Sequence, residues 1–161
     1  MWAALGADCP WNRIVSSPLI RCADFARALA QRHGLPLTLD DRLCEMHFGA
    51  WEGRRGAELL TTDAEALTQF WNDPINHTPP DGETFTHVQQ RVHSAWDAIL
   101  SNSIGAHVLI IAHGGPIRII LGHVLGMPPQ ALLRLELPFA AISRVRVDQH
   151  VASLVFHAGR L

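Results

Sequence analysis

The segment 108–118 constrains the fold of this chain more than any other stretch. The run Val-Leu-Ile-Ile-Ala at 108–112 is apolar and rich in β-branched residues, which is typical of a buried strand. The run stops at His113, and two glycines and Pro116 follow, with the proline where it suits the first turn of a helix. Because a helix N-terminus offers free N–H groups to anions, this junction predicts a phosphate-binding site at the carboxyl end of the strand.

Apolar patterning along the rest of the chain predicts strands that alternate with helices. This order predicts an α/β fold, specifically a three-layer α/β/α sandwich with a mainly parallel sheet, formed by residues 1–161 as a single domain. The last two strands are expected to pair as a hairpin. We expect the tail of a helix at 2–6, strands at 13–16, 37–39, 108–112, 133–137, 142–148 and 151–156, and helices at 18–33, 62–71, 116–125 and around 88–99.

Local signals predict where several helices begin and end. Ser17 and Pro18 are the residue types expected at an N-cap and at the first helical position, and Gly34 is expected to end that helix. Thr62 and Glu65 have the spacing of a capping box for the helix that runs to residue 71.

Composition and charge exclude several classes of protein. The hydrophobic content of 48% and the charged content of 17% indicate a globular chain. A net charge of −2 gives no basic surface for nucleic acid or for an acidic membrane. The three cysteines form no Cys-x-x-Cys pair and predict reduced thiols in a cytoplasmic protein. The histidines lack the spacing of a metal site, and proline and charged residues interrupt the apolar window 108–127, which argues against a membrane span.

Three residues outside the segment 108–127 are candidates for chemistry. Arg21 falls in the first turn of a predicted helix, where its guanidinium suits a phosphate, although taken alone a surface arginine is the simpler interpretation. Glu45 lies in a loop after a strand and suits a general acid, or else a carboxylate that pairs with an arginine. Glu83 precedes the long helix, and we interpret it as a favourable charge at that helix N-terminus.

Four motifs occur together and in order. They are Ser-Ser-Pro-Leu-x-Arg at 16–21, Leu-x-Glu-x-x-Phe-Gly-x-Trp-Glu-Gly at 43–53, Gly-Glu-Thr at 82–84, and Val-x-x-x-x-His-Gly-Gly-x-Ile-Arg at 108–118. In this combination the chain resembles the histidine phosphatase superfamily, also called the phosphoglycerate mutase-like family. The fold that this resemblance implies is the phosphoglycerate mutase-like sandwich.

Within that family, three short stretches look most like the α-ribazole phosphatases. They are Glu52-Gly53, the loop 71–74 and the Gly82-Glu83 helix start. Such enzymes remove the 5′-phosphate from α-ribazole phosphate in cobalamin synthesis. A phosphoglycerate mutase-like enzyme is the alternative within the same family.

The resemblance implies a hydrolase for a small phosphorylated substrate that needs neither metal nor cofactor. A histidine attacks phosphorus, and water then hydrolyses the phosphohistidine. In this chain Arg21 matches the phosphate clamp and Glu45 the proton donor to the leaving oxygen. His113 matches the second histidine, which contacts the transferring group. Gly114, at the start of the following helix, is expected to bind phosphate through its N–H.

The resemblance also places the nucleophile in an Arg-His-Gly motif at the end of a first strand. That strand, its loop and most of a helix would need roughly 30 to 40 residues upstream of Met1. We therefore expect this chain to be N-terminally truncated and to lack that strand. Arg-His-Gly does occur at 32–34, but there it ends a predicted helix, about 18 Å from Arg21 at 1.5 Å rise per residue. A missing strand would expose a sheet edge, which a homodimer could cover.

Two further functions remain open from the sequence. A chain without the nucleophile could be a relative or fragment that binds phosphorylated ligands without turning them over. Ser16 or Ser17 with His113 could form a serine hydrolase, but the chain contains no Gly-x-Ser-x-Gly motif, which argues against that chemistry.

Overall fold

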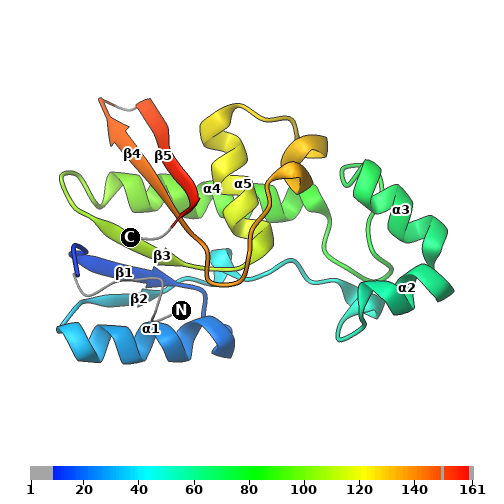
Figure 1. The fold of residues 1–161 in the computed structure, drawn as a ribbon, viewed down its shortest axis with the longest axis horizontal. Coiled ribbons are helices and arrows are strands. Elements are labelled where there is room, and N and C mark those ends of the chain that lie inside the picture. The colour runs from blue at the N-terminus through cyan, green and yellow to red at the C-terminus, as the bar shows by residue number, and fades with distance from the viewer. Residues whose placement is uncertain (1–8, 150, 160–161) are drawn as a thin grey trace.

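Three parallel strands form the central sheet of the protein (Figure 1). In this computed structural model β1 (Arg13–Ser16) lies between β2 (Leu37–Leu39) and β3 (Val108–Ile111). β3 is wholly apolar and β1 has Ile14 and Val15 at its centre, and a parallel sheet that is covered on both faces favours such runs. The strands at these positions were predicted from the sequence, and the structure confirms them.

The structure describes residues 9–149 and 151–159. The helix tail expected at 2–6 lies outside these residues. Within them, no helix combines the length and the apolar character that crossing a membrane requires.

Helices cover the central sheet on both faces (Figure 1). The side chain of Ile14 packs in a cluster with α1 (Ile20–His33), while that of Val15 packs with α4 (Phe85–Ser101) and α5 (Gly114–Leu125). Successive strand residues point to opposite faces of a sheet, so these two neighbours serve the two helical layers. The predicted α/β fold, a parallel sheet between layers of helices, is confirmed.

The carboxyl ends of β1 and β3 lie at the same edge of the sheet. Ser16 is paired with Ile111 in the parallel register, and the backbone N–H of Ser17 donates to the Ile111 carbonyl at 2.9 Å. The residues that follow the two strands therefore meet. This edge is where the chemistry-bearing segments of an open α/β sheet gather.

The C-terminal strands form the expected hairpin. β4 (Ile142–Asp148) pairs antiparallel with β5 (Val151–Gly159) as a separate two-stranded sheet. The second strand runs three residues beyond the predicted end. Val145 and Ala152 pack against the core that α4 and α5 share, so the hairpin is joined to the domain by apolar contact.

The strand predicted at 133–137 is wrong. A 3-10 helix occupies Pro129–Arg134, and Leu132 in it is buried. Leu132 packs against Gly122 of α5 so closely that a side chain at 122 would collide with it. This contact holds the 3-10 helix, whose last two residues overlap the predicted strand, and two consecutive prolines favour the tight turn that leads into it.

The helix predicted from a Thr62 capping box is also different. Two helices, α2 (Gly56–Thr62) and α3 (Ala64–Asn72), occupy the region, and Thr62 is the last residue of the first. Its hydroxyl donates to the Glu58 carbonyl at 3.2 Å instead of capping a helix. Glu58 itself accepts the backbone N–H of Arg55 at 3.2 Å, so the glutamate that serves as a cap lies seven residues earlier than predicted.

The first helix begins two residues later than predicted. α1 starts at Ile20, and the Ser17 hydroxyl accepts the N–H of Leu19 at 3.3 Å. Its end was predicted correctly, because Gly34 adopts φ 64° and ψ 31°, the left-handed conformation that glycine adopts most readily.

Candidate active site

His113 lies at the centre of the candidate site. It follows β3, forms the N-cap position of α5 and is 7% exposed. Arg21 Nε donates to His113 Nδ1 at 3.0 Å, and His113 Nε2 lies 2.8 Å from Ser17 Oγ. Because a guanidinium only donates, Nδ1 must be the acceptor, so the proton of the neutral imidazole resides on Nε2 and is donated to Ser17.

The environment keeps His113 neutral at neutral pH. Burial, followed by the positive charges of Arg21 and Arg91, lowers the pKa of His113 to about 4. A bound phosphoryl group would add negative charge beside the imidazole and oppose the two arginines. The histidine therefore suits contact with an anion.

Arg21 reaches this position from the first turn of α1. It is an exposed residue whose Nε alone is used by His113. Within the described part of the chain no other partner takes its terminal nitrogens, which therefore face outward for a ligand. A planar group with two free N–H edges matches phosphate oxygens.

Glu45 sits against the N-terminus of α5. Its Oε2 accepts the N–H of Gly115 at 3.3 Å, and its Oε1 accepts the N–H of Met46 at 3.0 Å. A Cβ at position 115 would collide with this carboxylate, so only glycine allows the approach. The positive end of the helix dipole favours a carboxylate there.

Gly114 also leaves room for a neighbouring side chain. A Cβ at this position would lie 2.9 Å from Arg118 Nη1, one turn along α5. Gly114 is the first residue of the helix, where the backbone N–H has no partner within the helix. The first turn thus presents the Gly114 N–H, with the guanidinium of Arg118 beside it, because the Gly115 N–H donates to Glu45, Pro116 has no N–H and the Ile117 N–H donates to the His113 carbonyl.

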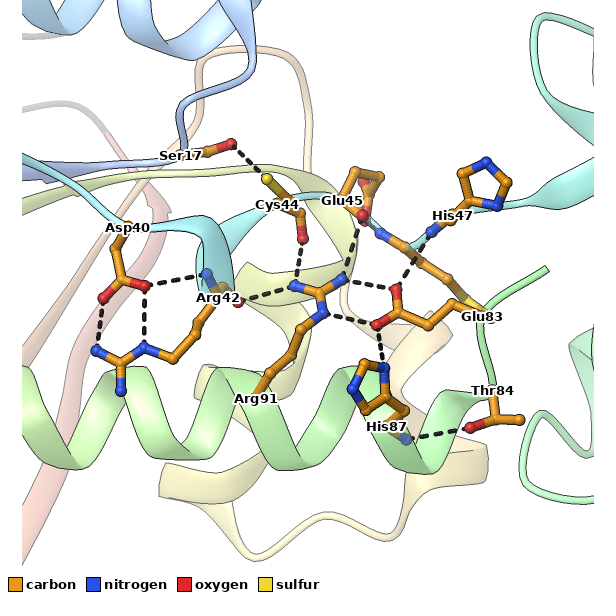
Figure 2. A network of polar contacts seen from close by, with 11 residues as sticks. Ser17, Asp40, Arg42, Cys44, Glu45, His47, Glu83, Thr84, His87 and Arg91 are labelled. Atoms are coloured by element: carbon orange, nitrogen blue, oxygen red, sulfur yellow. Dashed lines mark hydrogen bonds and ion pairs between the residues drawn. The ribbon is translucent and has the colours of Figure 1, made fainter.

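Arg91 of α4 holds the loop that carries Glu45 (Figure 2). Its Nη1 donates to the carbonyls of Arg42 at 2.8 Å and Cys44 at 2.7 Å, and its Nη2 donates to the Glu45 carbonyl at 3.2 Å. The side chain is 14% exposed. Three bonds from one rigid guanidinium fix the backbone of the loop on both sides of Cys44.

Glu83 pairs with Arg91 through two bonds, of 2.8 Å to Nε and 2.9 Å to Nη2. It also accepts the N–H of His47 at 3.3 Å and contacts His87 Nδ1 at 2.7 Å (Figure 2). Burial raises the pKa of Glu83, but the bond and the charge of Arg91 outweigh it, so the pKa lies below its ordinary value. Our interpretation of Glu83 as only a helix-end charge was incomplete, and the N-cap of α4 is Thr84.

Two thiols border the histidine. Cys22 is buried, its Sγ lies 3.6 and 3.7 Å from the two ring nitrogens of His113, and it donates to the Ala112 carbonyl at 3.5 Å. Ser17 Oγ donates to Cys44 Sγ at 3.8 Å. Burial raises the pKa of Cys22, which keeps it a neutral thiol despite the nearby Arg21.

The structure thus brings Arg21, Glu45, His113 and Gly114 together from three separate segments. The Arg-His-Gly at 32–34 lies elsewhere: His33 is the exposed last residue of α1, at the opposite end from Arg21. Among residues 9–149 and 151–159, no group of three or more His, Cys, Asp or Glu is placed to hold a metal ion.

Sequence reasoning missed Arg91 and Arg118 as parts of the site, and it considered Ser17 only as an N-cap and as a nucleophile beside His113. Glu83 precedes α4, so helical periodicity gives no signal for its pairing with Arg91. The contact of Ser17 with Cys44 also has no local signal, because Cys44 comes from a distant segment.

Comparison with known proteins gives one family. The model of the "Histidine phosphatase superfamily (branch 1)" matches residues 2–158. The chain is 40% identical over 130 residues to "Bifunctional protein Rv2228c" of Mycobacterium tuberculosis, covering 81% of this chain and 35% of that protein. It is 33% identical over 134 residues to "Probable phosphoglycerate mutase GpmB" of Yersinia pestis, covering 83% of this chain and 62% of that protein. The chain therefore spans less than two thirds of the length of these relatives.

Solved structures share the fold over almost the whole chain. The α-ribazole phosphatase from Shigella flexneri aligns with a TM-score of 0.81 at 28% identity, covering 98% of this chain and 77% of that one. Bacillus stearothermophilus YhfR aligns with a TM-score of 0.83 at 26% identity, covering 95% and 76%.

Proposed function

Because the chain belongs to the histidine phosphatase superfamily, we propose that it binds and hydrolyses small phosphomonoesters at the carboxyl edge of β1 and β3. One observation carries the proposal: Arg21 donates to His113 at 3.0 Å beside the α5 N-terminus, where Glu45 also lies. A guanidinium, an imidazole, a carboxyl group and the Gly114 N–H at the helix start together suit a phosphate ester and its leaving oxygen.

The proposed reaction has two transfers through a phosphohistidine. A histidine nitrogen bonds to phosphorus while the bond to the ester oxygen breaks, and that oxygen takes a proton from the Glu45 carboxyl. Water then attacks phosphorus and returns a proton to Glu45, the phosphorus–nitrogen bond breaks, and inorganic phosphate leaves. In both transfers Arg21, His113 and the Gly114 N–H would stabilise the charge on the phosphoryl oxygens.

The nucleophile distinguishes this proposal from a second one. Among residues 9–149 and 151–159, the Arg-His-Gly motif occurs at 32–34, and His33 lies away from the site. This observation favours a second candidate function, in which the chain binds phosphorylated ligands without turnover.

As the specific substrate we propose α-ribazole 5′-phosphate, in cobalamin synthesis and hence in the cytoplasm. The support is the set of motifs at 52–53, 71–74 and 82–83 and the 28% identity to the Shigella flexneri α-ribazole phosphatase. Similarity to the Yersinia pestis protein keeps 3-phosphoglycerate as the competing substrate. Homodimer formation remains a prediction.

The test measures binding and turnover separately. Isothermal titration with inorganic phosphate is run on the unaltered chain and on Arg21→Gln, and hydrolysis of p-nitrophenyl phosphate on the chain, His113→Ala and His33→Ala. We expect Arg21→Gln to weaken phosphate binding by about tenfold or more, since it removes a charged donor. Hydrolysis that His113→Ala abolishes and His33→Ala leaves unchanged supports the phosphatase.

The other outcomes separate the alternatives. Phosphate binding without hydrolysis selects the ligand-binding function. Loss of hydrolysis in His33→Ala would overturn our assignment of the 32–34 motif to a helix end. Phosphate binding that Arg21→Gln does not change would overturn both functions. A comparison of α-ribazole 5′-phosphate with 3-phosphoglycerate then decides between the two substrates.

A further inference from the structure

An apolar cavity of about 150 Å³ adjoins the phosphate end of the site. It shares Glu45 and Gly115 with that site and extends between α3, α4, α5 and the 3-10 helix at Pro129–Arg134. Glu45 therefore lies at the boundary between the cavity and the first turn of α5. In a phosphate ester, the oxygen that joins the phosphoryl group to the rest of the molecule occupies the equivalent boundary.

The wall of the cavity is almost entirely apolar. Apart from Glu45 and Arg118 at the phosphate end, every lining residue is apolar or glycine, including three phenylalanines, Phe48, Phe70 and Phe85. The described lining contains no hydroxyl or amide side chain. Arg118 has part of its hydrogen-bonding capacity occupied, because its Nε donates to the Leu135 carbonyl at 3.0 Å.

We propose that this cavity receives the alcohol part of the substrate, and that this part carries a single apolar six-membered ring. The inference rests on the proposed phosphomonoester function, and it favours a different substrate from α-ribazole 5′-phosphate and 3-phosphoglycerate, because the alcohol part of each of these carries hydroxyl groups for which this wall offers no partner beyond Glu45 and Arg118. A cavity of about 150 Å³ lined by apolar side chains is large enough for one benzene-sized ring. Aromatic edges and faces of the three phenylalanines suit contact with such a ring.

The same wall disfavours polyhydroxylated leaving groups. A sugar or glycerol hydroxyl that enters the cavity loses its water and finds no partner beyond Glu45 and Arg118. Unpaired buried hydroxyls weaken binding strongly, whereas an apolar ring gains from leaving water. The chemistry of the cavity thus selects aryl or cycloalkyl phosphates over glycerol phosphates.

The first experiment is a ligand series on the unaltered chain by isothermal titration. The ligands are inorganic phosphate, methyl phosphate, glycerol 1-phosphate, phenyl phosphate and phenol. We expect phenyl phosphate to bind about 10- to 100-fold more tightly than methyl phosphate, and glycerol 1-phosphate no more tightly than methyl phosphate. None of these measurements requires turnover.

A matched pair of variants locates the ring. Leu133 lines the cavity and is 50% exposed, whereas Leu125 is 45% exposed on α5 and does not line it. Leu133→Trp is expected to close the mouth and to remove the advantage of phenyl over methyl phosphate, and Leu125→Trp to leave it intact. Both replacements are on the surface, and thermal unfolding checks that each variant folds.

The outcomes separate this inference from the proposed function. If methyl phosphate binds with dependence on Arg21 but phenyl phosphate binds no better, the ring inference is overturned and the function stands. If phenol binds while no phosphate ligand does, the proposed function is overturned, and with it the assignment of the cavity to a leaving group. If Leu133→Trp and Leu125→Trp reduce the advantage of phenyl phosphate over methyl phosphate equally, the assignment of the ring to this cavity is also overturned.

Discussion

The hydrogen bonds around His113 run in one direction, from Arg21 through the imidazole to Ser17 and on to Cys44. The guanidinium can only donate, so His113 accepts at Nδ1 and donates from Nε2 to Ser17, which in turn donates to Cys44. The histidine is therefore held neutral with its proton on Nε2. The same arrangement leaves it responsive to any charge that enters beside Arg21.

Phosphate binding should raise the pKa of His113. In the absence of ligand, burial and the charges of Arg21 and Arg91 lower that pKa to about 4. An anion beside the imidazole favours its charged form, and a rise of about one unit or more is expected. An NMR titration of the imidazole with and without inorganic phosphate measures it. An unchanged pKa at saturating phosphate would place the anion away from His113.

At the scale of elements, the N-terminus of α5 is where strand, helix and loop meet. Gly114 and Gly115 allow Arg118 and Glu45 to approach the helix backbone. Arg91 of α4 ties the loop that carries Glu45 to that helix. The carboxyl group is thus positioned by two helices, neither of which contains it.

Gly115→Ala should displace the Glu45 carboxylate. The added Cβ would collide with Oε1, so the carboxylate, which ends a flexible side chain, swings away and loses its bond to the residue-115 N–H, at a cost of about 1 kcal/mol of unfolding free energy. Gly56→Ala is the control, because nothing lies within 4 Å of a Cβ there and its φ is not positive. Urea unfolding compares the two variants. Equal stability of both would mean that Glu45 does not depend on the glycine.

Arg91→Met should destabilise the protein severely. It removes both bonds from Arg91 to the partly buried Glu83 and leaves three carbonyls without a donor, which costs about 2–4 kcal/mol of unfolding free energy. Arg27→Met is the control: Arg27 and Asp24 form a pair in which both side chains are more than half exposed, so a change near zero is expected. Adding Glu83→Gln to Arg91→Met should recover part of the loss in urea unfolding, and the absence of recovery would contradict the pairing.

At the scale of the whole molecule, the parallel sheet makes the site. Arg21 and His113 are 92 residues apart in sequence, and they meet because β1 and β3 end at the same edge. Two histidines, His113 and His93, also make the stability of the fold depend on pH. Burial, then the neighbouring His123, whose ring centroid lies 4.5 Å away, lowers the pKa of His93 as well.

Stability should fall as the pH drops from about 6.5 towards 4. In this window the unfolded chain protonates His113, while the folded state, with a pKa of about 4, does not. The unfolded state binds more protons, so unfolding becomes easier by about 3 kcal/mol in all, with His93 adding in the same direction. Urea midpoints between pH 7 and 4 measure this, and His113→Gln should flatten the profile. A profile with the same slope in His113→Gln would contradict the assignment.

Two carboxylates affect the stability of the fold at a lower pH than the histidines do. The pKa values of Glu83 and Asp40 lie below their ordinary values, the first because Arg91 outweighs burial, the second through the bond from Arg42. Their contribution to stability is present above the ordinary carboxyl range and is lost as the pH falls through their lowered pKa values. The acid profile is therefore expected in two parts, histidine first and carboxylate second.

Much of the fold could be predicted because its signals are local. The run at 108–112, the period of α1 and the glycine at 34 each indicate an element through neighbours a few residues away. Predictions failed where a distant contact decided the conformation, as at the strand predicted for 133–137, where Leu132 packs on Gly122 and a 3-10 helix runs to Arg134. Glu83 was undervalued for the same reason, since its function depends on Arg91 and on a loop 36 residues away.

The sequence by itself determined the strands of the central sheet and of the C-terminal hairpin. It also placed Arg21, His113 and Gly114 at the ends of elements and Glu45 in a loop, where they can meet a ligand. The tertiary structure decided where the proton of His113 lies, which arginine holds the Glu45 loop, and that an apolar cavity adjoins Glu45. The reason is physical: periodicity and capping act within a few residues, whereas hydrogen-bond direction, burial and cavity shape arise only when separate segments pack.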